Sequence, residues 1–322
     1  MVGSEGGSRV LVTGATGYVG GHLVPVLLDR GHHVRALARK PDKLQHAPWR
    51  ERVEVVRGDL ADAGSLEAAF SGVDVVYYLV HSMGSAKDFE SEEQRSAHNV
   101  AAAAKASGVR RIVYLSGLHP NEDLSTHLRS RVAVGETLIK SGIETMVLQA
   151  GIVIGAGSAS FEMIRYLTNR LPVMTTPKWV RNTIQPISID DVLHYLAEAA
   201  EADLPESRTW DIGGPDVLQY GEAMQVYAEA AGLRPRVIIP LPLLTPSIAS
   251  WWVGLVTPIR SGLARPLVES LHSNNVALEH DIDDVIAKPA RGLTPYREAI
   301  ESALAADGAP PVRGRARLMR LK

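Results

Sequence analysis

The fold is decided by the stretch Arg9-Val10-Leu11-Val12-Thr13-Gly14-Ala15-Thr16-Gly17-Tyr18-Val19-Gly20. Its apolar half predicts a buried strand, and the residues from Tyr18 to Arg30 predict a helix. Gly14 suits a sharp turn, Gly17 lets backbone N–H groups approach a pyrophosphate, and Gly20 lets the helix pack closely on the strand. The positive end of the helix then faces the anion. The stretch therefore predicts a dinucleotide-binding turn.

The end of the second predicted strand indicates which dinucleotide binds. This strand covers 33–38 and runs directly into Arg39 and Lys40. A site for NAD would carry a carboxylate here to accept a hydrogen bond from the ribose 2′-hydroxyl, whereas two cations suit a 2′-phosphate. We therefore expect NADP(H) as the cofactor. The alternative is that Arg39 and Lys40 are solvated turn residues before Pro41.

The composition excludes several classes of function. The chain has 322 residues, enough for one large α/β unit with a smaller lobe, and a formal net charge of −2 that gives no reason to expect nucleic acid as a partner. The absence of cysteine excludes disulfides, cysteine-ligated zinc, iron–sulfur clusters and thiol nucleophiles. The 11 histidines show no metal-ligand spacing, so no metal site is expected.

The order of apolar runs predicts a Rossmann-type, doubly wound parallel α/β sheet with a smaller C-terminal substrate lobe. We expect a flexible N-terminus at 1–8, an NADP(H)-binding domain with six strands at 9–150, and a substrate lobe at 151–308 that is interleaved with the Rossmann core. The basic tail at 309–322 is expected to be solvated, with contact to anionic lipid or a partner as the alternative.

No sequence feature predicts a membrane or secretory protein. The N-terminus lacks the basic and then apolar plan of a signal peptide, so a cytoplasmic protein is expected. The most apolar stretch, 237–256, contains three prolines and fits a folded segment better than a transmembrane helix. The sequence leaves the oligomeric state open.

Five motifs follow one another along the chain: Thr-Gly-Ala-Thr-Gly-Tyr-Val-Gly at 13–20, Gly-Asp-Leu at 58–60, Tyr-Leu-Ser-Gly at 114–117, Gln-Pro-Ile-Ser-Ile-Asp-Asp-Val at 185–192 and Asp-Ile-Gly-Gly-Pro at 211–215. Their order, over about residues 8 to 300, resembles the extended or atypical short-chain dehydrogenase/reductase family. The chain is most similar to the NAD(P)H-binding branch with NmrA-like, YbjT-like and complex I 39 kDa subunit-like proteins. That branch contains enzymes and proteins that only bind the nucleotide.

The resemblance implies a cofactor site along the carboxyl edge of the sheet. Residues of the turn would line the pyrophosphate, Arg39 and Lys40 the 2′-phosphate, and Asp59 the adenine edge. Leu79 to His81 and Ser116 would run past the nicotinamide ribose. The expected cofactor-binding residues are Gly14, Thr16, Gly17, Tyr18, Val19, Gly20, Arg39, Lys40, Asp59, Leu60, Leu79, Val80, His81 and Arg131.

The chain departs from the family at the catalytic pair. Such enzymes reduce a carbonyl with Tyr-x-x-x-Lys, yet no tyrosine here has a lysine four residues on. His127 and Arg131 take that spacing on one helix face, so His127 is a candidate proton donor and Arg131 a ligand of the ribose hydroxyls. The alternative is a surface histidine and an arginine that binds only the cofactor or a carboxylate, because arginine cannot titrate as lysine does.

Three further residues are candidates for the chemistry. Ser116 ends the fifth predicted strand, where its hydroxyl could polarise a substrate carbonyl or serve only as a structural hydrogen-bond partner. His81 and His119 follow the fourth and fifth strands and are candidate acids, with solvated loop histidines as the alternative. Ser116, His127 and Arg131 are the expected catalytic set.

We expect an NADPH-dependent reductase of a small apolar carbonyl, enone or quinone-like substrate. The alternative is a non-catalytic NADP(H)-binding redox sensor or assembly protein. A nucleotide-sugar epimerase or dehydratase is the least favoured, because that chemistry needs the missing tyrosine.

Overall fold

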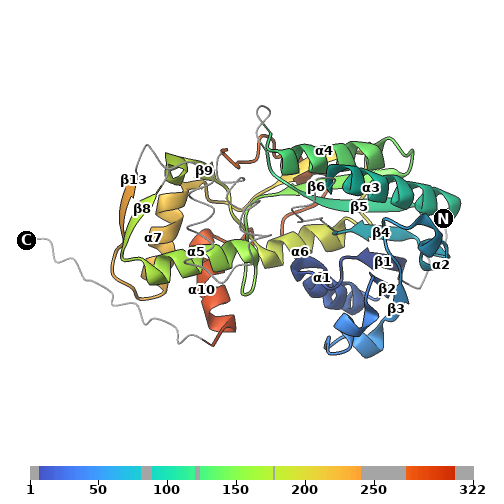
Figure 1. Cartoon of the computed structure of the whole chain (residues 1–322), viewed down its shortest axis with the longest axis horizontal. Helices are drawn as coiled ribbons and strands as arrows, with labels where there is room; N and C mark the ends of the chain where they lie inside the picture. Colours follow the sequence, from blue (N-terminus) through green and yellow to red (C-terminus); the bar gives the residue numbers. More distant parts are fainter. Residues whose placement is uncertain (1–6, 81–88, 120–123, 177, 241–272, 309–322) are drawn as a thin grey trace, which may run out of the picture.

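A computed structural model of the chain describes residues 7–80, 89–119, 124–176, 178–240 and 273–308 (Figure 1). Its centre is a seven-stranded sheet in the order β11-β6-β5-β4-β1-β2-β3, and all neighbouring pairs run parallel. The strands are β1 (Arg9–Thr13), β2 (His33–Ala38), β3 (Glu54–Arg57), β4 (Val75–Tyr78), β5 (Arg111–Gly117), β6 (Glu144–Ala150) and β11 (Arg208–Ile212). The strand order reverses between β1 and β4, so the predicted doubly wound α/β fold is confirmed.

Helices cover both faces of this sheet (Figure 1). One face is covered by α1 (Tyr18–Asp29) and α6 (Ile189–Glu198), and the other by α2 (Glu67–Phe70), α3 (Phe89–Ala106) and α4 (Thr126–Ile139). Successive residues of each strand point to opposite faces, so Val113 and Leu115 face α1 and α6, whereas Ile112 and Tyr114 face α3 and α4. Burial on both faces explains why these strands are apolar without alternation.

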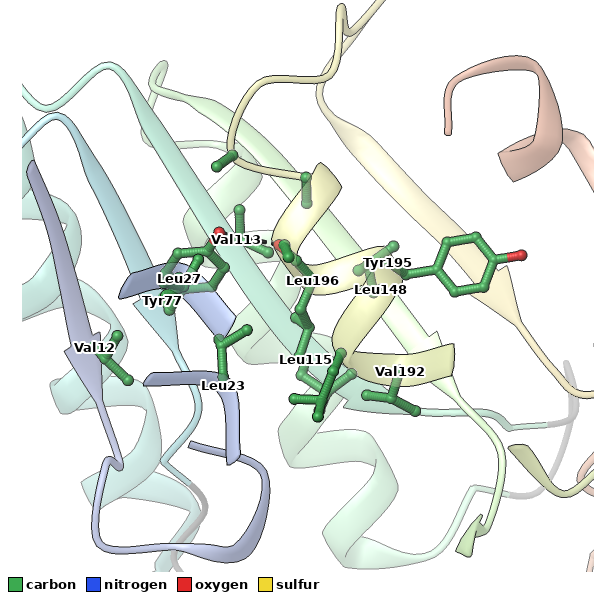
Figure 2. Close-up of a cluster of buried hydrophobic side chains, with 14 of the residues drawn as sticks. Val12, Leu23, Leu27, Tyr77, Val113, Leu115, Leu148, Val192, Tyr195 and Leu196 are labelled. Carbon is green, nitrogen blue, oxygen red and sulfur yellow. Dashed lines mark hydrogen bonds between the residues drawn. The ribbon is translucent and has the colours of Figure 1, made fainter. Parts of the chain in front are cut away.

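The packing of α6 on the sheet joins distant parts of the chain (Figure 2). Leu196 is fully buried beside Leu23 and Leu27 of α1 and the sheet residues of β4 and β5. The hydroxyl of the buried Tyr77 donates a hydrogen bond to the Leu196 carbonyl at 3.0 Å. A helix from the second half of the chain therefore completes the core of the first half.

The remaining elements form a smaller region at the opposite end of the molecule (Figure 1). Its helices are α5 (Ala159–Arg170), α7 (Tyr220–Ala230) and α10 (Tyr296–Ala306), and its two-stranded sheets pair β7 (Val153–Ile154) with β10 (Ile187–Ser188), β9 (Thr183–Ile184) with β12 (Leu218–Gln219), and β8 (Val173–Thr176) with β13 (Val237–Pro240). A separate apolar core that includes Phe161, Trp179, Tyr227 and Ile300 joins these helices.

Some predicted elements differ from the structure. The third strand covers only Glu54–Arg57, because residues Arg50–Arg52 form a turn of 3-10 helix. The sheet has one strand more than the six expected at 9–150, since β11 from the second half pairs with β6 from Arg208 to Ile212. Gln185 and Pro186 separate the two short strands β9 and β10.

In the ranges that the structure describes, no helix is long and apolar enough to cross a membrane. The expected basic tail at 309–322, residues 1–6 and most of the apolar stretch at 237–256 lie outside the described residues.

The packing of α6 generates a stability prediction. Leu196→Ala is expected to lower the free energy of unfolding by about 2–5 kcal/mol, because it leaves a cavity between α6 and the sheet. Leu278→Ala is the matched control, since Leu278 is 58% exposed, and it should change that free energy by less than about 0.5 kcal/mol. Urea denaturation followed by circular dichroism measures both. Equal stabilities for the two variants would contradict the assigned packing.

Candidate functional site

The glycine turn between β1 and α1 is built by two close backbone approaches. Gly14 has φ of +77°, and a Cβ at this position would lie 2.7 Å from the Leu79 carbonyl oxygen. A Cβ at Gly20 would lie 2.3 Å from the Gly14 carbonyl oxygen. A larger side chain at either position would therefore push the turn away from β4 or from the helix. The turn brings the start of α1 directly beside the end of β4.

The N-terminus of α1 is open to an anion. Gly17 caps the helix without a side-chain hydrogen bond, and no acidic residue lies in its first turn. The N–H groups of this turn are therefore left for a ligand, and the helix dipole favours a negative charge there. These features fit the pyrophosphate of a dinucleotide.

A cleft of about 480 Å³ runs along the carboxyl edge of the sheet from this turn. It is lined at successive strand ends by Thr13, Gly14, Thr16 and Gly17 after β1, Leu37, Ala38 and Arg39 at β2, Gly58, Asp59 and Leu60 after β3, Leu79 and Val80 after β4, and Glu92 and Ser96 on α3. Eight of the predicted cofactor residues thus meet in one cleft: Arg39, together with Gly14, Thr16, Gly17, Asp59, Leu60, Leu79 and Val80.

The loop after β3 is held in a fixed shape at the cleft. The Asp59 backbone N–H donates to Ser65 Oγ at 2.9 Å, and Asp59 Oδ1 accepts from the Ala61 N–H at 3.0 Å. Asn99 Nδ2 on α3 donates to the Leu60 carbonyl at 2.9 Å. This hydrogen bond fixes the loop against the helix.

Sequence reasoning missed the contribution of α3 to the cleft. Glu92 and Ser96 line it, and Asn99 supports the loop beside it. Glu92, Ser96 and Asn99 have an i, i+4, i+7 spacing that places them on one helix face, but the first half of α3 is polar throughout, so this spacing did not stand out in the sequence.

The Tyr18 side chain points away from the cleft. A Cβ at Gly155 would lie 2.2 Å from the Tyr18 hydroxyl, and the Tyr18 and His22 ring centroids lie 4.6 Å apart. Burial, and then the carboxylates of Asp190 and Asp307, raises the pKa of Tyr18 to about 12. Tyr18 therefore connects the turn to the second half of the chain, and only its backbone faces the anion site.

Three other predicted cofactor residues also stand apart from the cleft lining. The Val19 side chain packs against the core between α1 and the sheet, and Gly20 serves the close approach of the helix. Lys40 is exposed beyond the end of β2. His81 lies outside the described residues.

A second pocket of about 640 Å³ lies behind the turn and shares Thr16 and Gly17 with the cleft. Its basic lining residues are His22, Lys43, His46 and Arg52, and no carboxylate is among the residues that line it. Arg52 pairs with Asp29 at 3.0 Å. The region between the glycine turn and the loop after β2 therefore carries several basic side chains.

Arg131 lies beside Gly117 at the end of β5, and Gly117 follows Ser116 in the chain. Ser116 is 5% exposed, and a Cβ at Gly117 would lie 2.9 Å from Arg131 Nη1, so the guanidinium lies over the strand end. Burial raises the pKa of Tyr114 on the same strand, and the nearby Arg131 guanidinium and Ser116 hydroxyl partly oppose this shift. Arg131 of α4 thus lies beside the strand end that carries Ser116.

His127 lies one helical turn before Arg131 but contacts a different element. Its ring lies against Phe89 at the start of α3, with centroids 4.6 Å apart and an interplanar angle of 31°.

Within the described ranges, no group of three or more histidine, aspartate or glutamate side chains is arranged to hold a metal ion.

Comparisons with known proteins show what the chain is similar to. Residues 14–151 match a family model described as NAD(P)H-binding. The 3 beta-hydroxysteroid dehydrogenase/Delta 5→4-isomerase of Mycobacterium tuberculosis is 40% identical over 118 residues, which span 34% of this chain and 31% of that relative. The chain thus matches about a third of that relative's length. The 3-beta-hydroxysteroid dehydrogenase of Mycolicibacterium neoaurum is 26% identical over 310 residues, 83% of each chain.

Among solved structures, the triphenylmethane reductase of Citrobacter sp. complexed with NADP(H) superposes with a TM-score of 0.72 at 20% identity, covering 92% of this chain and 100% of that one. This likeness supports the fold. The glycine turn, the cleft at the strand ends and the matched family model lead to one conclusion: over residues 14–151, the chain is similar to NAD(P)H-binding proteins.

Proposed function

We propose that the protein is an NADPH-dependent reductase of a small apolar carbonyl, enone or quinone-like compound. The observation that carries this proposal is the cleft along the strand ends, which begins at the open N-terminus of α1 and leads towards Ser116 and Arg131 at the neighbouring strand. The two steroid dehydrogenases above have apolar substrates in their names, which favours an apolar substrate here.

The cleft lining suits each part of a dinucleotide. The pyrophosphate is bound by Gly14, Thr16, Gly17 and the backbone of Tyr18 and Val19, with Gly20 keeping the helix close. The adenine lies against Asp59 and Leu60, and the nicotinamide ribose lies past Leu79, Val80 and Arg131. When bound, NADPH supplies a hydride to the substrate.

The 2′-phosphate is bound by Arg39 and Lys40. Both side chains are exposed, and neither has an ion-pair partner among the described residues. Lys43 adds positive charge in the adjoining pocket. Charge-assisted hydrogen bonds from such a set to a phosphate are stronger than neutral ones, so NADPH is preferred over NADH.

Protein groups at the end of β5 orient the substrate. The Ser116 hydroxyl donates a hydrogen bond to the substrate carbonyl oxygen, and the Arg131 guanidinium binds ribose hydroxyls. Arginine keeps its proton at all relevant pH values, so a different group must give the proton. Residues 151–308 form the lobe that contacts the substrate.

A second candidate function is an NADP(H)-binding protein without catalysis. The absence of any Tyr-x-x-x-Lys pair favours it, since the family uses this pair to deliver the proton.

Arg39→Asp tests the cofactor preference. The substitution removes up to two charge-assisted hydrogen bonds, so affinity for NADPH should fall about 10- to 100-fold while affinity for NADH is retained or rises. Fluorescence titration with both nucleotides measures the ratio. Arg234→Asp, at an exposed position beyond α7, is the control and should leave the ratio unchanged. An unchanged ratio in Arg39→Asp would refute the assigned phosphate site.

Ser116→Ala separates a reductase from a binder. The unsubstituted protein should oxidise NADPH, followed at 340 nm, with at least one member of a quinone and apolar carbonyl panel. Removing one hydrogen-bond donor to the oxygen should lower kcat about 10²- to 10³-fold with NADPH affinity unchanged. Ser71→Ala, which is exposed before β4 at the opposite sheet edge, should have no effect. Tight NADPH binding without turnover of any compound would favour the binder.

A further inference from the structure

Three buried polar side chains lie side by side at the carboxyl end of the sheet. Ser116 on β5 is in register with Gln149 on β6, and Gln149 is in register with Asp211 on β11. They are 5%, 7% and 8% exposed. Paired residues of parallel strands point to one face, and Tyr114 and Val147 two residues earlier belong to the core beneath α3 and α4. Ser116, Gln149 and Asp211 therefore form one polar row on that face.

This polar row is unusual for its position. The central strands of a doubly covered parallel sheet are apolar, and each buried polar group costs about 1–3 kcal/mol when it lacks a partner. The polar row lies at the edge where sheets of this topology bind their ligands. Its position therefore suggests that these polar groups serve a ligand.

A histidine is held over the polar row. His119, two residues beyond β5, is half-buried, and its Nε2 lies 2.9 Å from Gln149 Nε2. An amide is a suitable partner for both protonation states, since its NH₂ donates to a neutral ring nitrogen and its oxygen, after rotation, accepts from an imidazolium.

Asp211 supplies a carboxylate beside this histidine. Burial raises the pKa of Asp211, and its backbone bond from Leu278 and the nearby His119 and His280 oppose the shift, while Asp281 adds to it. The carboxylate accepts the Leu278 N–H at 2.8 Å, and the Asp211 N–H donates to Glu279 Oε1 at 2.6 Å. The bond from Leu278 fixes the carboxylate, and the bond to Glu279 fixes the backbone of Asp211.

The polar row lies on the continuation of the cofactor cleft. The cleft follows the ends of β3, β2, β1 and β4, and the next strands in the sheet are β5, β6 and β11. The proposed adenine and phosphate contacts, Asp59 and Arg39, are at the β3 and β2 end. The reacting end of a dinucleotide therefore points towards β5 and the polar row.

We propose that His119, held by Gln149, is the proton donor of the reductase. This inference rests on the function proposed above. The carbonyl carbon gains the hydride that NADPH supplies, and the carbonyl oxygen gains one N–H proton from the His119 imidazolium. The products are an alcohol, the oxidised nucleotide and a neutral imidazole, which water reprotonates. His127 is assigned a packing role, because its ring lies against Phe89.

Matched histidine variants test the assignment. With the most active compound of the panel, His119→Gln should lower kcat about 10²- to 10⁴-fold, and the control His98→Gln, at an exposed position on α3, should stay within about threefold. Both should bind NADPH as tightly as the unsubstituted protein, which also shows that they fold. In His119→Ala, added imidazole should restore part of the turnover, because it supplies the missing proton donor.

A spectroscopic measurement provides a readout besides activity. In protein labelled with ¹⁵N-histidine, the His119 ring signals are those lost in His119→Gln. They should shift when 1,4-naphthoquinone is added to the complex with oxidised NADP, whereas the His127 signals should not. Gln149→Leu should shift the His119 signals without any ligand.

The outcomes distinguish the two proposals. Undiminished turnover in His119→Gln, loss of turnover in His127→Gln, or a naphthoquinone shift confined to His127 would overturn the role of His119 and leave the reductase proposal standing. Failure of the unsubstituted protein to oxidise NADPH with any compound would instead refute the reductase itself.

Discussion

The structure depends on the close approach between the Gly14 turn and the end of β4. With a Cβ excluded at Gly14 and at Gly20, the turn contacts the Leu79 backbone on one side and the first turns of α1 on the other. This contact sets the position of the helix N-terminus relative to the strand ends, and the cleft follows from it. The anion site needs no charged side chain, because its donors are backbone N–H groups held by this packing.

The proposed chemistry differs in how charge is distributed from that of the short-chain dehydrogenases/reductases that carry a Tyr-x-x-x-Lys pair. An arginine at the end of β5 supplies a permanent positive charge, so binding the ribose and giving the proton fall to different residues. Titratable groups lie on the neighbouring part of the sheet. They belong to His119 and to the polar row of Ser116, Gln149 and Asp211 on β5, β6 and β11. A fixed cation and a separate titrating group divide the two tasks that a tyrosine and lysine share.

The sequence alone predicted the features that depend on neighbours in the chain. Local motifs predicted the glycine turn and the succession of strands along the chain through β6. The rule that parallel strands share a carboxyl edge predicted the residues at strand ends, such as Asp59. The pairing of β11 with β6, the meeting of His119 with Gln149 and the face of α3 that carries Glu92 arise from contacts between distant segments. A single sequence carries no direct record of such contacts.

The return of β11 to the sheet affects how the protein can be divided. A fragment that ended at residue 150 would leave the outer edge of β6 unpaired from Met146 to Ala150, and it would lack the α6 side chains that cover α1. An unpaired strand edge beside an uncovered apolar face is a template for aggregation. Residues 9–150 thus carry the nucleotide-binding motifs, yet their core is completed by strand and helix from the second half of the chain.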